Sequence, residues 1–255
     1  MQQLTIVKVG GKIIDDTESL TKFINDFALL EGDKILIHGG GNSATNLAKQ
    51  LSIRTKIVDG RRITDKEMLK VVTMVYAGLI NKNIVAQLQK LQVNAIGLTG
   101  ADLNLILSEK RPVKEIDYGF VGDVKKVNSQ ALLMMLEQNY LPVIAPLTHD
   151  GNGNLLNTNA DTIAAETAKA LSVDCNVRLI YCFEKRGVLM NEADENSVIP
   201  IINLEMFQEY KNQGIIQSGM IPKLENAFQA IASGVKEVII TRASDINTGK
   251  GTFIQ

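Results

Sequence analysis

The sequence predicts an α/β fold, a sandwich in which helices cover a mainly parallel sheet. Short apolar segments alternate with amphipathic helical segments along the whole chain, which is the pattern of strands joined by crossover helices. Two of the apolar segments run straight into glycine turns, Gly10-Gly11 and Gly39-Gly40-Gly41, and a helical pattern follows each turn. These junctions indicate β-α-β units, whose parallel crossovers are right-handed.

The first half of the chain alternates strands and helices up to one long helix. We expect strands over 4–9 and 34–38, helices over 17–30, 43–51 and 65–91, and a hairpin over 56–63 turned at Asp59-Gly60. Asp16 or Thr17 caps the first of these helices. Thr64 opens a capping-box sequence before the long helix, and Gly78 marks the place where that helix can kink.

The rest of the chain continues the alternation. After a strand over 94–100 and short strands to residue 127, Ser129 is expected to cap a helix that ends at Asn139. Further on we expect strands over 141–147, 177–182 and 237–241, a helix ending at Leu171, helices over 204–213 and from the Ser218-Gly219 turn to Ala232, and a glycine-broken tail over 249–254.

The composition fits one globular domain over residues 1–255 and excludes several classes. With 255 residues, 45% of them hydrophobic, the chain can bury a substantial core. Its 27 Lys and Arg balance 28 Asp and Glu without a basic run, so we expect no nucleic-acid partner. Only 2 cysteines and 2 histidines are present, too few for a Cys/His zinc site. No signal peptide and no apolar run near the ~18 residues of a membrane span are found, so we expect a cytoplasmic protein without membrane contacts.

The two glycine turns predict a polyphosphate pocket. Glycine lets the backbone approach a ligand closely, and the first N–H groups of the following helix have no partner within it. Lys8 stands two residues before the first glycine pair. Glycine in either turn alone is equally well explained by turn geometry, but two such turns with Lys8 between them favour phosphate binding.

The remaining polar residues favour phosphoryl transfer. Asn157, Asn159 and Asp161 gather at a predicted helix opening, where capping accounts for only one of them. The chain has no GxxxxGK[ST] or GxGxxG motif and suggests no Ser-His-Asp set. Glycine turns, Lys8, Lys223 and Asp161 are the groups that position reactants and neutralise charge in phosphoryl transfer.

Five motifs in order resemble the amino acid kinase family, most closely its members that phosphorylate N-acetylglutamate. They are Lys8-Val-Gly10-Gly11, His38-Gly-Gly-Gly41, Gly60-Arg-Arg62-Ile-Thr64, Asn157-Thr-Asn159-Ala-Asp161 and Gly219-Met-Ile-Pro-Lys223. The resemblance covers nearly the whole chain and implies an open three-layer αβα sandwich. It implies an amino-terminal lobe over about 1–170 that binds the acyl amino acid and provides the dimer contacts, and a carboxy-terminal lobe over about 171–255 that binds ATP.

The resemblance also implies an activity and a set of roles. The reaction is the ATP-dependent phosphorylation of the γ-carboxylate of N-acetyl-L-glutamate to N-acetyl-L-glutamyl 5-phosphate, in arginine biosynthesis. The implied catalytic residues are Lys8 and Lys223, which stabilise the transferring phosphoryl group, and Asp161, which holds both lysines. The implied substrate-binding residues are Gly40, Gly41, Arg62 and Asn157, and the implied nucleotide- and phosphate-binding residues are Lys8, Gly10, Gly11, Gly40, Gly219, Met220 and Lys223. The implied cofactor is ATP with Mg²⁺ held by the nucleotide, and no metal site on the protein.

Alternatives remain at this point. Glu184 stands where the resembled family has an aspartate beside the nucleotide, which leaves the nucleotide contacts open. N-succinyl-L-glutamate is an alternative substrate, glutamate 5-kinase and aspartate kinase are alternative enzymes, and a non-catalytic nucleotide or amino-acid sensor is the alternative outside enzymes. Both lysines and Asp161 are retained, which speaks against a sensor.

The long helix and the amino terminus predict an oligomeric state. The helix over 65–91 is longer than one small sheet needs, so part of its apolar face is available to a second subunit. Only three residues precede the first strand, whereas arginine-inhibited members of the resembled family carry an extra helix there. We therefore expect a homodimer that arginine does not inhibit.

Overall fold

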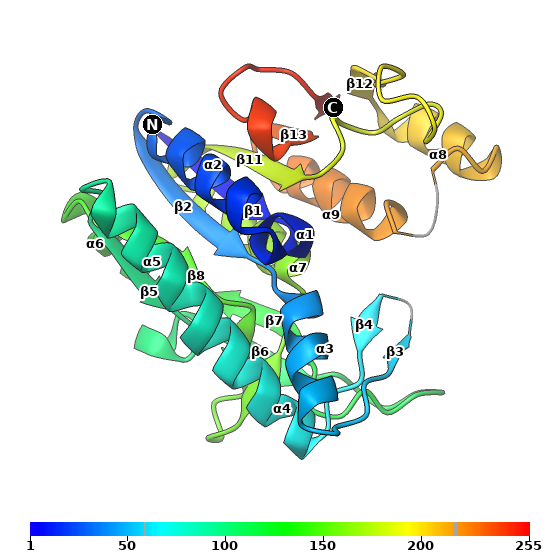
Figure 1. The fold of residues 1–255 in the computed structure, drawn as a ribbon. Coiled ribbons are helices and arrows are strands. Elements are labelled where there is room, and N and C mark those ends of the chain that lie inside the picture. Colours follow the sequence, from blue (N-terminus) through cyan, green and yellow to red (C-terminus); the bar gives the residue numbers. More distant parts are fainter. Residues whose placement is uncertain (59, 217–218) are drawn as a thin grey trace.

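An eight-stranded sheet forms the centre of the computed structural model, which describes residues 1–58, 60–216 and 219–255 (Figure 1). The strands lie in the order β12 (Ile201–Ile202), β14 (Thr252–Ile254), β13 (Glu237–Arg242), β11 (Cys175–Phe183), β1 (Gln2–Val9), β2 (Asp33–His38), β8 (Leu141–Ile144) and β5 (Ala95–Leu98). Neighbours pair in parallel except β13 with β14. The predicted mainly parallel sheet is confirmed.

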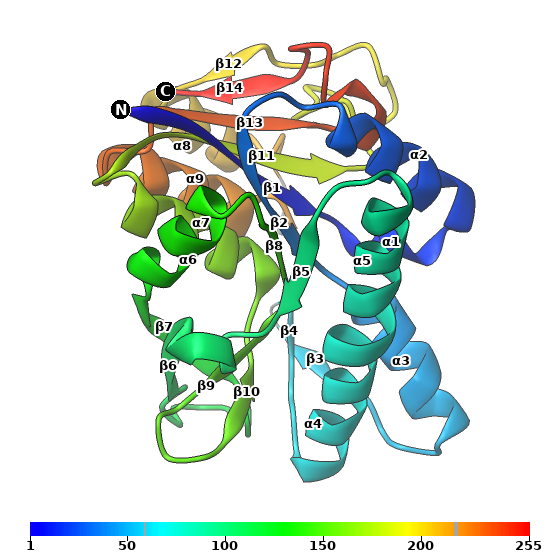
Figure 2. The same cartoon turned by 90° about the vertical axis from the view of Figure 1, so that its left-hand side faces the viewer.

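Helices cover both faces of this sheet, and each face has its own hydrophobic core. One face carries α1 (Gly11–Asp15), α2 (Thr17–Ala28), α3 (Gly41–Gln50) and a long helix made of α4 (Lys66–Val72), a π-helical segment η1 (Thr73–Ile80) and α5 (Asn81–Lys90). The other carries α6 (Ser129–Glu137), α7 (Ala160–Leu171), α8 (Leu204–Asn212) and α9 (Ile221–Ala232), as Figure 2 shows. The result is the expected three-layer αβα sandwich.

A second, four-stranded sheet extends one end of the molecule and was not predicted as a separate unit. Its strands lie in the order β10 (Leu155–Asn157), β9 (Leu147–His149), β6 (Ile106–Lys110) and β7 (Gly122–Val127). The strand predicted over 141–147 is in fact two strands, β8 and β9, one in each sheet. The chain turns between them because Pro146 has no N–H to donate, while the Leu147 N–H turns back to the Ala145 carbonyl at 2.8 Å.

Two predicted caps are wrong by one residue. α4 is capped by Asp65, which accepts from the Met68 N–H, and not by Thr64. α6 is capped by Asn128, which accepts from the Ala131 N–H, and not by Ser129. The true cap lies one residue later in α4 and one residue earlier in α6. From that position its side-chain oxygen reaches an unpaired N–H group of the first helical turn.

The long helix passes through the π-helical turns of η1, and these turns include Gly78, the position where a kink was expected. By length and composition the span Lys66–Lys90 could cross a membrane, with a mean hydropathy of 1.2 over its most apolar window. Of that window 44% is buried inside the structure, and core helices of soluble proteins meet the same criterion.

The predicted hairpin is present as an antiparallel pair, β3 (Ile57–Val58) and β4 (Arg61–Arg62). Asp59, in its predicted turn, lies outside the described residues. The helix to Ala232 was expected to begin at the Ser218-Gly219 turn, and Ser218 also lies outside the described residues. The described part of that helix, α9, begins at Ile221 with Pro222 in its first turn, where a missing N–H costs nothing.

Candidate active site

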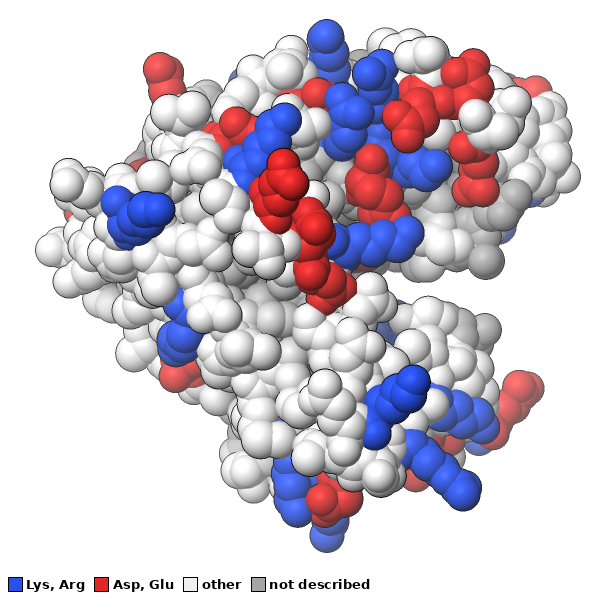
Figure 3. Space-filling model, viewed as in Figure 1, with Lys and Arg blue, Asp and Glu red and all other residues white. Residues whose placement is uncertain are grey.

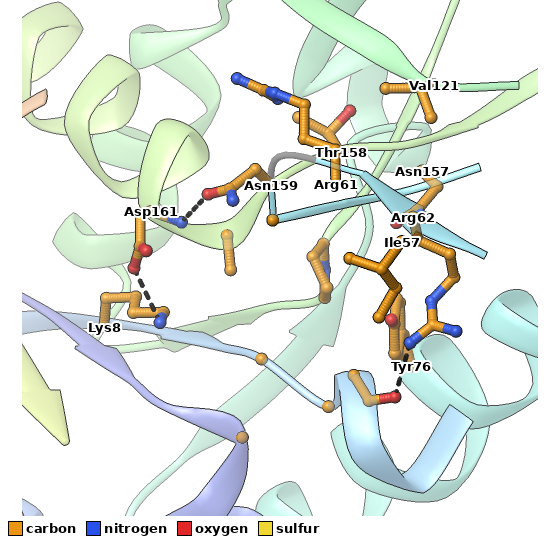
Figure 4. Close-up of a pocket in the computed structure, with 17 residues that line it drawn as sticks. Lys8, Ile57, Arg61, Arg62, Tyr76, Val121, Asn157, Thr158, Asn159 and Asp161 are labelled. Carbon is orange, nitrogen blue, oxygen red and sulfur yellow. Dashed lines mark hydrogen bonds and ion pairs between the residues drawn. The ribbon is translucent and has the colours of Figure 1, made fainter. Parts of the chain in front are cut away.

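A buried carboxylate bridges two lysines at the centre of the candidate site. The Asp161 Oδ1 atom lies 2.7 Å from the Lys8 Nζ atom, and its Oδ2 atom lies 2.7 Å from the Lys223 Nζ atom (Figure 4 shows the Lys8 pair). Lys8 comes from β1, Asp161 from the first turn of α7, and Lys223 from the first turn of α9. The Asn159 side chain caps α7 by accepting from the Asp161 N–H, which fixes where the carboxylate projects.

The lysines keep this carboxylate ionised. Burial by itself would raise the pKa of Asp161, but the positive charges of Lys8 and Lys223 outweigh burial and hold that pKa well below its usual range. One negative charge between two positive charges leaves the cluster with a net charge of about +1 in a largely buried place. The site therefore attracts a polyanion without carrying an unpaired buried acid.

The two glycine turns meet beside this cluster. β1 and β2 pair in parallel with Val9 opposite His38, so both strands deliver their turns to the same edge of the sheet. A Cβ atom placed on Gly11 would lie 3.6 Å from the N atoms of both Gly40 and Gly41. Within the described residues, the N–H groups of Gly11, Gly40 and Gly41 donate to no backbone carbonyl. The backbone nitrogens of these three residues therefore lie close together, with N–H groups available to an anion.

Gly10 differs from the other glycines of the turns. Its N–H group donates to the Cys182 carbonyl at 2.9 Å, so it extends the pairing of β1 with β11. Gly10 also packs closely, since an added Cβ would lie 3.4 Å from that carbonyl oxygen. The N–H role that the sequence suggested for Gly10 would require this bond to open, and what the structure shows for Gly10 is close packing under the turn.

A cavity of about 240 Å³ opens next to the turns (Figure 4). Its walls include Lys8, Gly11, Gly40, Gly41, Arg62, Asn157 and Asp161, together with Arg61, Tyr76, Val121 and the segment from Thr158 to Ala160. Seven of the residues to which the family resemblance assigned a role therefore meet in one place. The space-filling view shows the molecule hollowed on its right-hand side, with Lys and Arg side chains at the upper edge of the hollow (Figure 3).

Arg62 is buried in the cavity wall, and one of its guanidinium nitrogens has no hydrogen-bond partner among the described residues. Its Nη2 atom donates to the Gly41 carbonyl and to the Thr45 hydroxyl, both at 2.8 Å. Its Nη1 atom is buried and has no hydrogen-bond partner among the described residues. An unpaired buried guanidinium donor is costly unless an anion completes it. Asn157, across the cavity, donates to the Thr64 hydroxyl at 2.9 Å.

Arg61 belongs to a different cluster. It is half-buried, and its pKa is lowered by burial and by the neighbouring charge of Arg111. Arg111 in turn pairs with Asp123 at 2.5 Å and lies over the Tyr118 ring. The two adjacent arginines of β4 therefore face different surroundings, and only Arg62 is tied to a glycine turn.

Four of the residues to which the family resemblance assigned a role do not line the cavity. Gly10 is packed beneath it, and Gly219, Met220 and Lys223 lie at the start of α9, where Lys223 reaches back to Asp161. Glu184 accepts from Lys12 at 2.5 Å, which joins the end of β11 to α1. Burial opposes ionisation of Glu184, but the hydrogen bond from Lys12 lowers its pKa.

Sequence reasoning missed Tyr76, which lines the cavity, and Ile80, which packs beside it against Gly40. Tyr76 and Ile80 of η1 pack against Gly40, which has φ +151°, and a Cβ there would lie 2.4 Å from the Ile80 Cδ1 atom. Their helical spacing hid them among ordinary core positions. Lys12 directly follows the first glycine pair but does not line the cavity, and its ammonium group pairs with Glu184. No cluster of three or more His, Cys, Asp or Glu side chains suited to a metal ion occurs in the described part of the chain.

The chain matches known proteins over its length. The model of the amino acid kinase family matches residues 3–242. An acetylglutamate kinase of Parabacteroides distasonis is 64% identical over 254 residues, which is 100% of each chain. The crystal structure of smu.665 from Streptococcus mutans UA159 has a TM-score of 0.83 and 28% identity and covers 99% of this chain and 98% of its own. Carbamate kinase from Giardia lamblia bound to AMP-PNP has a TM-score of 0.70 at 12% identity, covering 99% of this chain and 98% of its own, and shares the fold.

Replacing Asp161 by Asn should lower the free energy of unfolding by about 3 kcal/mol near pH 7, because the buried ammonium group of Lys8 and the partly buried one of Lys223 lose their shared anion. The folded pKa of Asp161 lies below its unfolded value of ~3.9, so its stabilisation is complete above about pH 5 and is lost as the pH falls. In urea unfolding curves the difference between variant and wild type should therefore stay nearly constant down to about pH 5, begin to shrink near about pH 4, and shrink most at still lower pH.

Asp123→Asn is the matched control, because it removes a carboxylate from a more exposed arginine pair and should cost less than about 1 kcal/mol. Unfolding curves at neutral pH that coincide for Asp161→Asn and wild type would show that the bridged lysines do not depend on this anion.

Proposed function

The chain belongs to the amino acid kinase family, and from this premise we propose that it transfers the γ-phosphoryl group of ATP to the γ-carboxylate of N-acetyl-L-glutamate. The product is N-acetyl-L-glutamyl 5-phosphate, an intermediate of arginine biosynthesis. The chain is a phosphotransferase whose acceptor is a carboxyl group. The observation that carries this function is the Lys8–Asp161–Lys223 bridge, which lies beside a cavity with a free arginine donor. A relative named acetylglutamate kinase, 64% identical over the whole chain, supports the same substrate.

The acceptor needs no general base. A γ-carboxylate has an ordinary pKa near ~4.3 and is already ionised at neutral pH. The obstacle is the repulsion between this anion and the triphosphate, so the protein must neutralise charge and hold the two reactants in line. Lysine ammonium groups and backbone N–H groups do this, and their effect is largest where negative charge spreads over the transferring phosphoryl group.

The proposed phosphate contacts are divided between the two ends of the site. Lys8 and the N–H groups of Gly11, Gly40 and Gly41 reach the transferring phosphoryl group from the strand ends. Lys223, Gly219 and Met220 reach the nucleotide from the start of α9, whose first N–H groups favour an anion. Asp161 keeps Lys8 and Lys223 at a fixed separation between these two ends.

Arg62 and Asn157 are proposed to hold the α-carboxylate side of the acyl amino acid. Arg62 offers the buried Nη1 donor that has no partner among the described residues. All residues that line the cavity lie between Lys8 and Asp161, which supports acyl amino acid binding by an amino-terminal lobe over about 1–170. We assign ATP binding to the lobe over about 171–255.

Mg²⁺ enters with the nucleotide in this proposal. Asp161 is held by two lysines, and Glu184 by Lys12, so neither carboxylate is free for the ion. The ion, bound to phosphate oxygens and water, neutralises part of the triphosphate charge. We place the enzyme in the cytoplasm and propose no nucleic-acid or membrane partner.

The proposed substrate is tested by ATP-dependent acyl phosphate formation, trapped as the hydroxamate. N-acetyl-L-glutamate should give the highest kcat/KM, against N-succinyl-L-glutamate, L-glutamate and L-aspartate. N-succinyl-L-glutamate is the second candidate, because Arg61 also lines the cavity and could meet an additional carboxylate. Product formation from free glutamate or aspartate alone would contradict the proposal.

Lys8→Ala and Lys223→Ala should each lower kcat about 10²-fold or more with little change in either KM, since each charge is needed most in the transition state. Lysine-to-arginine replacements should not restore the rate, because the planar guanidinium cannot occupy the place of the ammonium group against Asp161. Steady-state kinetics with both substrates varied provides the measurement. A variant that keeps near wild-type kcat would remove that lysine from the mechanism.

Arg62→Ala should raise the KM for the acyl amino acid about 10- to 100-fold, and lower kcat much less, because the lost bond to a carboxylate does not change during the reaction. Arg61→Ala is the matched control: it changes the neighbouring arginine of the same strand, which belongs to the Arg111 cluster. A larger increase in KM from Arg61→Ala would mean that Arg61, and not Arg62, binds the substrate carboxylate.

We further propose a homodimer formed through the long helix. Met74 and Leu79 of η1 are 51% and 58% exposed, and the surface over this helix carries few charges (Figure 3). Light scattering should give a mass near twice 27.9 kDa. Leu79→Glu should give monomers, whereas Leu29→Glu, at an exposed position beyond α2, should not. A monomeric wild type, or a Leu79→Glu variant that stays dimeric, would exclude this face.

A further inference from the structure

A buried histidine lies directly behind the second glycine turn and has no role in the chemistry above. His38 ends β2, and its side chain is fully buried. Its Nδ1 atom lies 2.8 Å from the Gly39 carbonyl oxygen, and its Nε2 atom lies 3.3 Å from the Asn81 Nδ2 atom. Asn81, also buried, begins α5 immediately after the π-helical segment.

Backbone acceptors at both ends of this chain of contacts determine where the protons lie. The Asn81 amide nitrogen must face the Val143 carbonyl, 2.9 Å away, because that oxygen can only accept. The same nitrogen has a second hydrogen, which it donates to His38 Nε2. The Gly39 carbonyl also only accepts, so His38 must carry its proton on Nδ1. The imidazole is therefore the neutral Nδ1–H tautomer.

Burial keeps the ring in this neutral form. The pKa of His38 is lowered to about 4 because the ring is buried, although its bond to Gly39 opposes this in part. At neutral pH the ring is then a fixed dipole that donates at one end and accepts at the other.

The bond to Gly39 controls the direction of the next N–H group. The Gly39 carbonyl and the Gly40 N–H belong to one planar trans peptide, so they point in opposite directions. With the carbonyl held at His38, the Gly40 N–H points away from the ring. The Gly40 N atom itself lies beside the first glycine turn, since a Cβ added to Gly11 would be 3.6 Å from it. Ile80 and Tyr76 pack against Gly40 itself, and a π-helical turn supplies both of them, as such turns often do at functional sites.

We propose that His38 is a positioning residue, which through its Nδ1–H···O bond to Gly39 aims the Gly40 N–H at the transferring phosphoryl group, while Asn81 holds the ring in the required tautomer. The inference rests on the phosphoryl transfer proposed above. His38 then affects the rate only by orienting the peptide group between Gly39 and Gly40.

Two substitutions of His38 test the roles of its Nδ1 and Nε2 atoms separately. The amide nitrogen of Asn can take the place of Nδ1, and that of Gln the place of Nε2, so His38→Asn keeps a donor to Gly39 whereas His38→Gln does not. His38→Gln should lower kcat ~10-fold or more and change the KM for the acyl amino acid less than about 3-fold, because a misaligned N–H donor weakens transition-state stabilisation. His38→Asn should recover most of that loss. Thermal unfolding of both variants separates this pattern from a loss of folding.

The wild-type protein allows a test that does not depend on activity. The chain has only 2 histidines, so ¹⁵N-labelled histidine gives two rings, and His149→Gln assigns them. His38 should show a protonated Nδ1 and an unprotonated Nε2, unchanged from about pH 6 to 8. A protonated Nε2 would overturn the proposal, even if the variants fail to fold.

The kinetic outcomes are equally decisive. Equal kcat for folded His38→Gln and wild type, or equal loss in His38→Asn and His38→Gln, would mean that the Nδ1 contact does not aim the peptide. If the wild type forms no acyl phosphate, the proposed function fails, which is a different result from a wrong tautomer.

Discussion

The ion pairs of Asp161 with Lys8 and Lys223 tie together three segments that are distant in the chain. The two ammonium groups would repel each other if that anion were missing, because Lys8 is buried and Lys223 is only partly exposed to screening by water. The arrangement sets the position of α7 and α9 against the end of β1. It also leaves a positive charge at the strand ends, and the remaining features of the site are arranged around this charge.

Parallel pairing determines which groups share that charge. Because β1 and β2 run side by side in register, their glycine turns and unpaired N–H groups reach the same edge as Lys8. The small sheet and the hairpin then close the cavity from the opposite side, with Asn157 from β10 and Arg62 from β4. Arg62 connects the two sides directly, since it donates to the Gly41 carbonyl. A ligand anchored at Arg62 is thereby placed beside the phosphate-binding turns.

Much of this could be predicted from the sequence because it depends on local signals. Apolar runs ending in glycine located β1, β2 and the turns, and the Asn159 and Asp161 segment marked the opening of α7. The pairing of Asp161 with both lysines came from the family resemblance, since no local pattern joins residues so far apart.

The small sheet was missed because its strands are short and its partners come from separate segments. The capping residues of α4 and α6 differed by one position, because neighbouring polar side chains compete for the same N–H groups. Tyr76, Ile80 and Asn81 were hidden because their helical spacing resembles that of any core helix, and only the fold brings them under Gly40.

Calorimetry of a transition-state analogue tests the role of the bridged lysines most directly. The wild type is titrated with MgADP and aluminium fluoride in the presence of N-acetyl-L-glutamate, and Lys8→Met and Lys223→Met are titrated in the same way. If the lysines stabilise the phosphoryl group in the transition state, each variant should bind the analogue about 10²-fold more weakly while its affinity for MgADP alone changes little. Equal losses of affinity for the analogue and for MgADP would contradict this role, and would mean that the lysines only bind the nucleotide.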